Sequence, residues 1–319
     1  MTRARRIIID LKFDRPDLVA GMQPYFPDFD IIDLADKAQV GRDLTGIDYA
    51  IVWKPDADLF TRAQDLKVLF SGGAGVDHVM AVPGLPDIPL VRFVDRNLTT
   101  RMSEWVVLQC LIHLRRVLPY LDQQKKRHWH EFIQPEAAEV TVGVMGLGVL
   151  GLDAATKLKG LGFNVIGWSR TKKHIDGMET FDAAGLDAFL GKTDILVGLL
   201  PLTPETTGFY NKTLFAKLKK DGPLGSPFFI NAGRGKSQNE DDLLAALTDG
   251  TLGGASLDVF AVEPLPQASP LWALDNVVIT PHAAAPSEPS ALFAHVRREI
   301  DRYEAGETLQ FTINRTTGY

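Results

Sequence analysis

The sequence has 319 residues, of which 45% are hydrophobic and 23% are charged, and its formal net charge is −6. These proportions are ordinary for a globular protein, and the length predicts two domains of usual size. The acidic balance argues against a nucleic-acid partner, which would normally require a basic face. The single cysteine, Cys110, excludes an internal disulfide and predicts a buried thiol in a reducing, cytoplasmic compartment.

The first 100 residues contain short apolar runs that alternate with polar, helix-length segments. The basic start Met1–Arg6 is followed by an apolar stretch that is too short for a signal peptide, and no apolar run approaches the roughly 20 residues of a membrane span. We therefore expect no membrane association and a βα pattern from the outset. The predicted strands are Ile7–Ile9, Tyr49–Trp53, Val68–Phe70 and Leu90–Phe93.

The apolar segment Arg101–Arg116 predicts a helix that continues into the basic stretch Gln123–His130 and bridges the two domains. Beyond it, six nearly continuous apolar runs are separated by helix-length segments, which is typical of a parallel sheet buried on both faces. The predicted strands are Val140–Met145, Val165–Trp168, Ile195–Leu200, Phe228–Asn231, Ala255–Val259 and Val277–Thr280.

The tail Glu288–Tyr303 carries apolar residues at helical spacing, so it predicts a helix long enough to cross back onto the first domain. The expected organisation is a substrate-binding domain over 1–100, a dinucleotide-binding domain over 101–286 and a returning C-terminal helix and tail over 287–319.

The stretch G-L-G-V-L-G at 146–151 directly follows a predicted strand and opens a predicted helix. In such a unit Gly146 permits the tight turn, Gly148 lets the backbone approach a pyrophosphate, and Gly151 allows close helix packing. The context therefore predicts dinucleotide binding.

The end of the next strand, Trp168-Ser169, lacks the acidic residue that normally holds a ribose 2′-hydroxyl. Arg170, Thr171, Lys172 and Lys173 follow as side chains suited to a phosphate, so the sequence predicts NADP(H) in preference to NAD(H). A solvated basic turn is the alternative explanation.

Three further strand ends carry polar side chains, at the edge where open α/β sheets bind ligands. Arg234 lies on the glycine-flanked turn after Phe228–Asn231 and suits a planar carboxylate, although the motif alone would favour a surface arginine in a β-turn. Glu263 follows the Ala255–Val259 strand and His282 ends the last strand. A ketone becomes an alcohol by hydride delivery to carbon and proton delivery to oxygen, so an imidazolium held by a carboxylate is a suitable acid.

The chain resembles the D-isomer-specific 2-hydroxyacid dehydrogenase family over essentially its whole length. The matching motifs, in the family's order and spacing, are G-L-G-V-L-G, Leu200–Thr206, Asn231–Gly235, Leu257–Phe260 with Glu263-Pro264, and Thr280–His282. The resemblance implies an α/β fold with two doubly wound parallel-sheet lobes. One is a Rossmann NAD(P)-binding domain, the other a flavodoxin-like substrate domain, and a cleft lies between them.

By the same resemblance, His282 is the acid/base, Glu263 its partner and Arg234 the cation that orients the substrate. Asp258 is implied to bind the nicotinamide carboxamide, and backbone N–H groups around Gly73, Ala74 and Gly75 the substrate carboxylate. The complete expected cofactor set is Gly146, Gly148, Val149, Leu150, Gly151, Trp168, Ser169, Arg170, Thr171, Lys172, Leu200, Pro201, Thr206, Ala232, Gly233 and Asp258.

Within the family, the chain is most similar to the glyoxylate/hydroxypyruvate reductase A subgroup. The similarity rests on Trp53–Pro55, Met102–Trp105, Trp168–Thr171 and the terminal Thr317–Tyr319. It implies reduction of glyoxylate to glycolate and of hydroxypyruvate to D-glycerate. Trp53 would wall a small substrate pocket, with plain core packing as the equal alternative.

Three further expectations complete this interpretation. The family implies a homodimer, in which the helix from Met102 to Leu118 would pack against its copy, although burial between the lobes of one chain explains that helix as well.

No metal is expected, since His128 and His130 form the only close histidine pair. A reductase of a bulkier 2-oxo acid such as phenylpyruvate and a non-catalytic, dinucleotide-sensing module of the corepressor type are the alternative functions.

Overall fold

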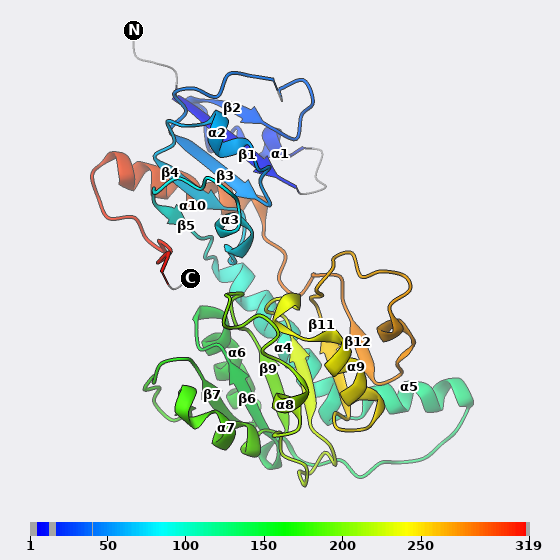
Figure 1. Ribbon diagram of the computed structural model, residues 1–319. Helices are drawn as coiled ribbons and strands as arrows, with labels where there is room; N and C mark the ends of the chain where they lie inside the picture. Colours follow the sequence, from blue (N-terminus) through cyan, green and yellow to red (C-terminus); the bar gives the residue numbers. More distant parts are fainter. Residues whose placement is uncertain (1–4, 13–16, 40, 317–319) are drawn as a thin grey trace. The chain divides into compact units, whose positions relative to one another are not determined.

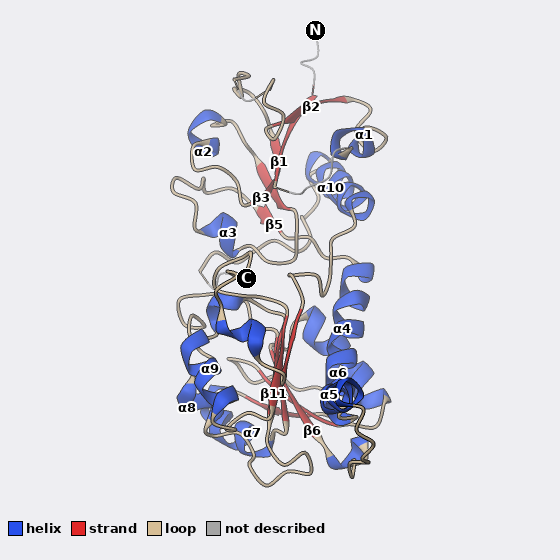
Figure 2. Ribbon diagram, turned by 90° about the vertical axis from the view of Figure 1, so that its right-hand side faces the viewer, coloured by secondary structure: helices blue, strands red, loops and turns tan. Residues whose placement is uncertain are grey.

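The structure is a computed structural model that describes residues 5–12, 17–39 and 41–316 (Figure 1). The terminal motif Thr317–Tyr319 therefore lies outside the described residues. The chain divides into a first unit, Met1–Leu98 with Ser287–Tyr319, and a second unit, Thr99–Pro286. Each unit is a parallel sheet with helices packed on both faces, so the α/β fold class is as predicted (Figure 2).

The first unit has five parallel strands in the order β2-β1-β3-β4-β5, which is the flavodoxin-like order. In the view of Figure 2, α1 and α10 cover one face of this sheet and α2 and α3 the other. The strands are β1 Arg5–Leu11, β2 Phe29–Asp33, β3 Tyr49–Trp53, β4 Val68–Ser71 and β5 Leu90–Val91, and the helices are α1 Leu18–Met22, α2 Leu59–Arg62, α3 Asp77–Met80 and α10 Pro289–Glu304.

The second unit has seven parallel strands in the order β12-β11-β10-β9-β6-β7-β8. Counted from β6, this is the dinucleotide-binding order 3-2-1-4-5-6 with a seventh strand added at one edge. The strands are β6 Thr141–Met145, β7 Asn164–Trp168, β8 Glu179–Phe181, β9 Ile195–Gly198, β10 Phe228–Asn231, β11 Gly254–Leu257 and β12 Val277–Ile279.

Helices pack on both sides of the second sheet (Figure 2). They are α4 Arg96–Leu114, which begins in the first unit, α5 Val117–Lys126, α6 Val149–Gly160, α7 Leu186–Lys192, α8 Lys212–Phe215 and α9 Glu240–Thr248. Short 3₁₀ helices lie at Ala137–Glu139, Ala183–Gly185, Gly235–Ser237 and Pro270–Ala273.

The structure corrects several predicted elements. The strands β2 and β8 were not expected, and the predicted strands at Leu90–Phe93, Ile195–Leu200 and Ala255–Val259 are each two residues shorter at their carboxyl ends. The predicted helix Arg101–Arg116 begins five residues earlier, at Arg96, and does not run on into Gln123–His130. Arg116 and Arg127 adopt left-handed conformations, with φ of 55° and 52°, and these residues bound the separate helix α5.

The core of each sheet explains why the apolar runs could be recognised. Ile7, Ile8 and Ile9 of β1 are all completely buried, and so are Ile195, Leu196 and Val197 of β9. Consecutive residues of a strand point to opposite faces, so burial of all three requires helices on both sides. Among the described residues, every helix is too short or too polar to cross a membrane.

Candidate active site

The glycine-rich turn between β6 and α6 has the local structure that its sequence predicts. Gly146 has a φ of +105°, and a Cβ on it would lie 2.5 Å from the carbonyl oxygen of Leu199. A Cβ on Gly151 would lie 1.9 Å from the carbonyl oxygen of Gly146. The predicted tight turn and close helix packing are thus confirmed.

Gly148 differs from the other two glycines because a Cβ there would meet no described atom within 4 Å. It is the residue before α6, and Val149, the first helical residue, is 43% exposed. The amino end of a helix carries partial positive charge and unpaired N–H groups. The open space over Gly148 therefore fits the approach of a pyrophosphate, which remains a prediction for Gly148, Val149 and Leu150.

Trp168, at the end of β7, supports this turn with its backbone and not with its ring. Its carbonyl oxygen accepts a hydrogen bond of 3.0 Å from the N–H of Gly146. Its indole is 6% exposed and donates to the carbonyl of Asp182 over 2.8 Å. The ring is therefore buried and hydrogen-bonded within the second unit, and a cofactor contact at Trp168 stays a prediction.

The turn that follows β7 is closed by Ser169, whose hydroxyl donates to the carbonyl of Thr171 over 2.8 Å. Arg170, Thr171 and Lys172 are exposed. The ammonium of Lys172 donates to the carbonyl of Thr180, away from the glycine turn, whereas Lys173 donates to the carbonyl of Leu147 over 2.7 Å. Of the two lysines, Lys173 is thus the one that reaches the glycine turn.

The loop after β9 is tied together by Thr206, whose hydroxyl donates to Pro201 and accepts from the N–H of Thr203, each over 2.7 Å. A side-chain hydrogen bond from Thr203 lowers the pKa of Glu205, and the charge of Arg170 acts in the same direction. Arg170 is therefore near enough to this loop for its charge to act on Glu205. Leu200, at the start of the loop, is 7% exposed.

Arg234 lies on a turn that is held by the completely buried Asn231. The amide of Asn231 donates to the carbonyl of Arg234 over 3.2 Å and to Gln238 over 2.9 Å, and its oxygen accepts from Gly233 over 3.0 Å. A Cβ on Gly235 would lie 1.9 Å from the carbonyl carbon of Phe260, so only glycine fits there. The turn, with Ala232 and Gly233, is consequently rigid, and Arg234 is partly buried on it.

Asp258, just past β11, is 1% exposed and holds the loop that carries His282. Its carboxylate accepts hydrogen bonds from the hydroxyl of Thr280 over 2.5 Å, from Ala283 over 2.8 Å and from Ala284 over 3.0 Å. The carbonyl of Asp258 also accepts from the N–H of His282 over 2.8 Å. The structure thus shows Asp258 in a positioning role, and a nicotinamide contact stays a prediction.

His282 and Glu263 are brought together as the sequence predicts. The His282 Nδ1 atom lies 2.9 Å from Glu263 Oε2, and Glu263 Oε1 accepts from the N–H of Phe260 over 3.2 Å. The His282 side chain is 39% exposed and that of Glu263 24%. His282 has a φ of 53°, a conformation that costs a non-glycine residue about 1 to 3 kcal/mol. With Nδ1 directed at a carboxylate, Nε2 is the nitrogen left for a substrate oxygen.

In the first unit, the Gly73–Gly75 loop follows β4. The hydroxyl of Ser71 donates to the carbonyl of Gly75 over 2.9 Å and lies 3.4 Å from the N–H of Gly73. The partly exposed indole of Trp53 covers this loop, because a Cβ on Gly73 would lie 2.5 Å from the ring. Trp53 also packs against His78, with ring centroids 4.2 Å apart. Trp53 therefore belongs to the loop surface and not to the core of the sheet.

Within the described ranges, no group of three or more His, Cys, Asp or Glu side chains is arranged to hold a metal ion. The rings of His128 and His130 stack with centroids 6.1 Å apart, without a third ligand. The chemistry available at the second sheet is thus that of an imidazole, two carboxylates and a guanidinium.

Comparison with known proteins agrees with this arrangement. Residues 107–284 match the family model described as the NAD binding domain of D-isomer specific 2-hydroxyacid dehydrogenases. The chain is also 40% identical, over 85% of its length and 88% of the relative, to glyoxylate/hydroxypyruvate reductase A of Serratia proteamaculans. The protein belongs to the D-isomer specific 2-hydroxyacid dehydrogenase family.

Two solved structures are similar over 99% of this chain and 100% of their own. One is a probable 2-hydroxyacid dehydrogenase from Rhizobium etli in complex with NADP, HEPES and L(+)-tartaric acid, with 63% identity and a TM-score of 0.94. The other is an NADPH-dependent glyoxylate/hydroxypyruvate reductase from Sinorhizobium meliloti in complex with NADP and sulfate, with 60% identity and a TM-score of 0.96.

Two glycine substitutions should separate folding from ligand binding in this turn. Gly151→Ala places a Cβ 1.9 Å from a backbone oxygen, so the melting temperature of the free protein should fall by several degrees. Gly148→Ala meets open space and should leave that temperature within a degree or two while weakening NADPH binding about tenfold or more. Differential scanning calorimetry and fluorescence titration measure the two quantities. Equal melting temperatures for the two variants would contradict the packing role of Gly151.

Proposed function

We propose that the protein reduces glyoxylate to glycolate and hydroxypyruvate to D-glycerate, with NADPH as the reductant. The observation that carries this proposal is the His282–Glu263 pair, 2.9 Å apart, on the same sheet as the glycine turn. Both residues follow strand ends, as does the turn, and ligands of open α/β sheets bind at that edge. The similar reductases of Serratia proteamaculans and Sinorhizobium meliloti support the choice of substrates.

NADPH, when bound, supplies a hydride to the carbonyl carbon. His282 then has the task of placing a proton on the carbonyl oxygen. Its Nδ1–H donates to Glu263, so the ring is fixed in the tautomer and orientation that leave Nε2 to hold and release that proton.

The substrate carboxylate requires positive partners, and two are available in this proposal. Arg234 presents a guanidinium on a rigid turn, and the backbone N–H groups of the Gly73–Gly75 loop suit an anion. The first unit is thereby assigned to substrate binding and the second to dinucleotide binding. Trp53, on the loop, would limit the size of the acid that fits.

The preference for NADPH over NADH is assigned to the turn after β7. Ser169 carries no charge to repel a 2′-phosphate, and the exposed Arg170 follows it directly. An arginine binds a phosphate through two parallel hydrogen bonds, and its charge is not titratable in the physiological range. The two similar structures that contain NADP support this assignment.

His282→Gln should abolish turnover while leaving NADPH binding nearly unchanged, because glutamine cannot donate and recover a proton as imidazole does. Loss of a general acid lowers kcat by roughly 10²- to 10⁴-fold. Stopped-flow single-turnover measurements and NADPH titrations provide both values. An unchanged kcat would remove His282 from the mechanism.

Arg170→Ala should raise the KM for NADPH by about tenfold and leave the KM for NADH within a factor of two, since only NADPH has the 2′-phosphate. Lys192→Ala is the matched control, because Lys192 is an exposed lysine of the same unit that pairs with Glu179. Steady-state kinetics with both cofactors tests this. Equal effects of Arg170→Ala on NADPH and NADH would disprove the 2′-phosphate assignment.

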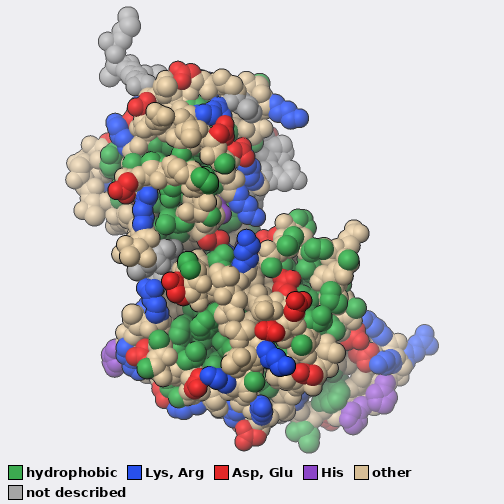
Figure 3. Space-filling view, viewed as in Figure 1, with side chains coloured by type: hydrophobic (Ala, Val, Ile, Leu, Met, Phe, Trp, Pro, Cys, Tyr) green, Lys and Arg blue, Asp and Glu red, His purple; other side chains and the backbone are tan. Residues whose placement is uncertain are grey.

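We also propose that the protein is a homodimer, formed through α4, α5 and the extended arm over residues 127–136. Charged side chains of both signs are interspersed over the surface, and a hydrophobic cluster lies beside histidines at the edge of the second unit (Figure 3). The exposed apolar residues of this region are Leu108 at 52%, Leu121 at 46%, Trp129 at 100% and Ile133 at 96%. Large apolar side chains exposed to this degree on neighbouring parts of the chain support an interface.

Replacing Trp129 and Ile133 with serine should therefore convert a dimer of twice 35.1 kDa into a monomer of 35.1 kDa. Trp272→Ser is the matched control, since Trp272 is a 53% exposed tryptophan outside this surface. Light scattering after size exclusion gives the masses. A monomeric wild-type protein, or a double variant that stays dimeric, would contradict the proposed interface.

A further inference from the structure

Arg92 directly follows β5 and has an unusual environment for an arginine. It is partly buried, and burial lowers its pKa with no described carboxylate to offset the effect. No described residue accepts a hydrogen bond from its guanidinium or forms an ion pair with it. Removing a charge from water is costly unless a partner compensates, so a partly buried cation with no partner in the described part of the chain requires an explanation.

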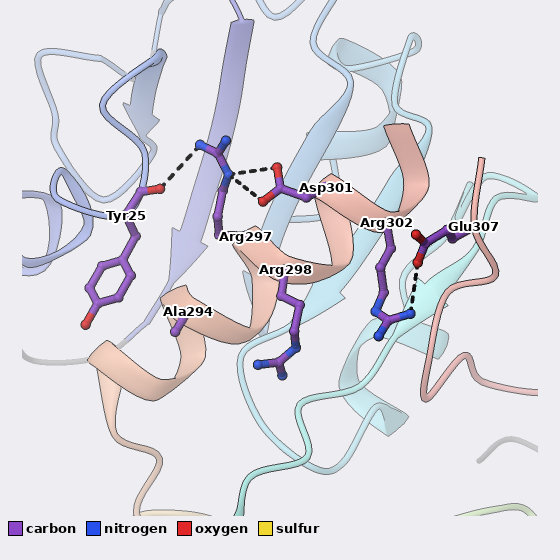
Figure 4. Close-up of a pocket in the computed structure, with 7 residues that line it drawn as sticks. All are labelled: Tyr25, Ala294, Arg297, Arg298, Asp301, Arg302 and Glu307. Atoms are coloured by element: carbon purple, nitrogen blue, oxygen red, sulfur yellow. Dashed lines mark hydrogen bonds and ion pairs between the residues drawn. The ribbon is translucent and has the colours of Figure 1, made fainter. Parts of the chain in front are cut away.

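The arginines of α10 in the same unit show the usual arrangement (Figure 4). Arg297 binds Asp301 over 2.9 Å and Asp28 over 2.6 Å, and Arg302 binds Glu307 over 3.1 Å. Arg297 and Arg302 line a pocket together with their partners Asp301 and Glu307. Both arginines are thus paired with carboxylates, whereas no described residue pairs with the Arg92 side chain.

The strand register places Arg92 beside the Gly73–Gly75 loop. β4 and β5 pair Leu69 with Leu90 and Phe70 with Val91. Ser71 is the last residue of β4 and Arg92 is the first residue after β5, so both lie at the carboxyl edge of the sheet from which the Gly73–Gly75 loop extends. The hydroxyl of Ser71 donates to Gly75 of the loop.

A second contact fixes Arg92 against the same loop. The N–H of Phe93 donates to the carbonyl of Gly73 over 3.2 Å, and the N–H of Arg92 itself donates to Phe311 over 3.2 Å. The backbone of Arg92 is thus held on both sides, while its side chain is left without a partner among the described residues. Arg92 also follows a strand's carboxyl end, where ligands of such sheets bind.

We infer that Arg92 is a second cation for the substrate carboxylate, acting together with the backbone N–H groups of the Gly73–Gly75 loop. This inference rests on the proposed function, because it adds a residue to the same substrate site. The guanidinium fork matches a planar carboxylate, and the loop offers N–H groups to the same kind of anion. The ligand class is a small 2-oxo acid, bound through its 1-carboxylate.

The test compares Arg92→Met with Arg96→Met, a matched variant of an exposed arginine four residues further along the chain. Oxalate, a planar and unreactive mimic of a 2-oxo acid, is titrated calorimetrically into each protein with NADPH present. Arg92→Met should weaken oxalate binding about tenfold or more, as expected for a charge-assisted hydrogen bond. Arg96→Met should bind oxalate as the wild type does, and Arg92→Lys, which keeps the charge, should recover part of the loss.

Two further readouts distinguish a ligand residue from a structural one. The affinity for NADPH should not change in Arg92→Met, and its melting temperature should not fall, because the substitution removes an unpaired charge. In turnover, KM should rise by the same factor for glyoxylate and hydroxypyruvate, with a much smaller change in kcat.

The inference is overturned if Arg92→Met binds oxalate like the wild type, if Arg96→Met weakens binding equally, or if the wild type does not bind oxalate. It is also overturned if KM rises only for dicarboxylic 2-oxo acids, since Arg92 would then bind a second acidic group. A wild type that binds oxalate through Arg92 but oxidises NADPH with no 2-oxo acid would instead refute the proposed function alone.

Discussion

The buried carboxylate of Asp258 is the constraint on which the candidate site depends. At 1% exposure it must be satisfied by protein groups, and Thr280, Ala283 and Ala284 supply the hydrogen bonds. These residues flank His282, whose N–H is bound by the Asp258 carbonyl. The left-handed backbone of His282 is thus maintained by several bonds that would be lost together, so the imidazole is presented to Glu263 on a fixed loop.

Buried polar side chains also hold the backbone at two other strand ends. The buried Asn231 holds the turn of Arg234, and the buried Ser71 holds the loop that ends in Gly75. In each case a buried, hydrogen-bonded polar side chain inside the unit fixes the backbone of a residue that is proposed to bind the ligand. Preorganisation of this kind is what allows charged groups to bind or react without first paying for reorientation.

Strands that are buried on both faces can be predicted from the sequence, whereas edge strands cannot. Apolar runs such as Ile195–Val197 announce central strands, whereas the edge strands Phe29–Asp33 and Glu179–Phe181 contain acidic residues because one side faces solvent. The roles of Gly146 and Gly151 could be predicted because they depend on local backbone geometry. The inward ring of Trp168 and the lack of a partner for Arg92 among the described residues could not be predicted, because side-chain direction depends on tertiary neighbours. The available signal was an arginine inside the apolar run Leu90–Phe93.

The central claim is that the protein is an NADPH-dependent reductase of small 2-oxo acids. This claim is tested most directly with the wild-type protein. The measurement is kcat/KM for glyoxylate, hydroxypyruvate and phenylpyruvate, each with NADPH and with NADH, and with the products identified by NMR. The account predicts glycolate and glycerate as products, with NADPH preferred and phenylpyruvate disfavoured. Tight binding of NADPH without oxidation by any of these acids, or a preference for phenylpyruvate, would contradict it.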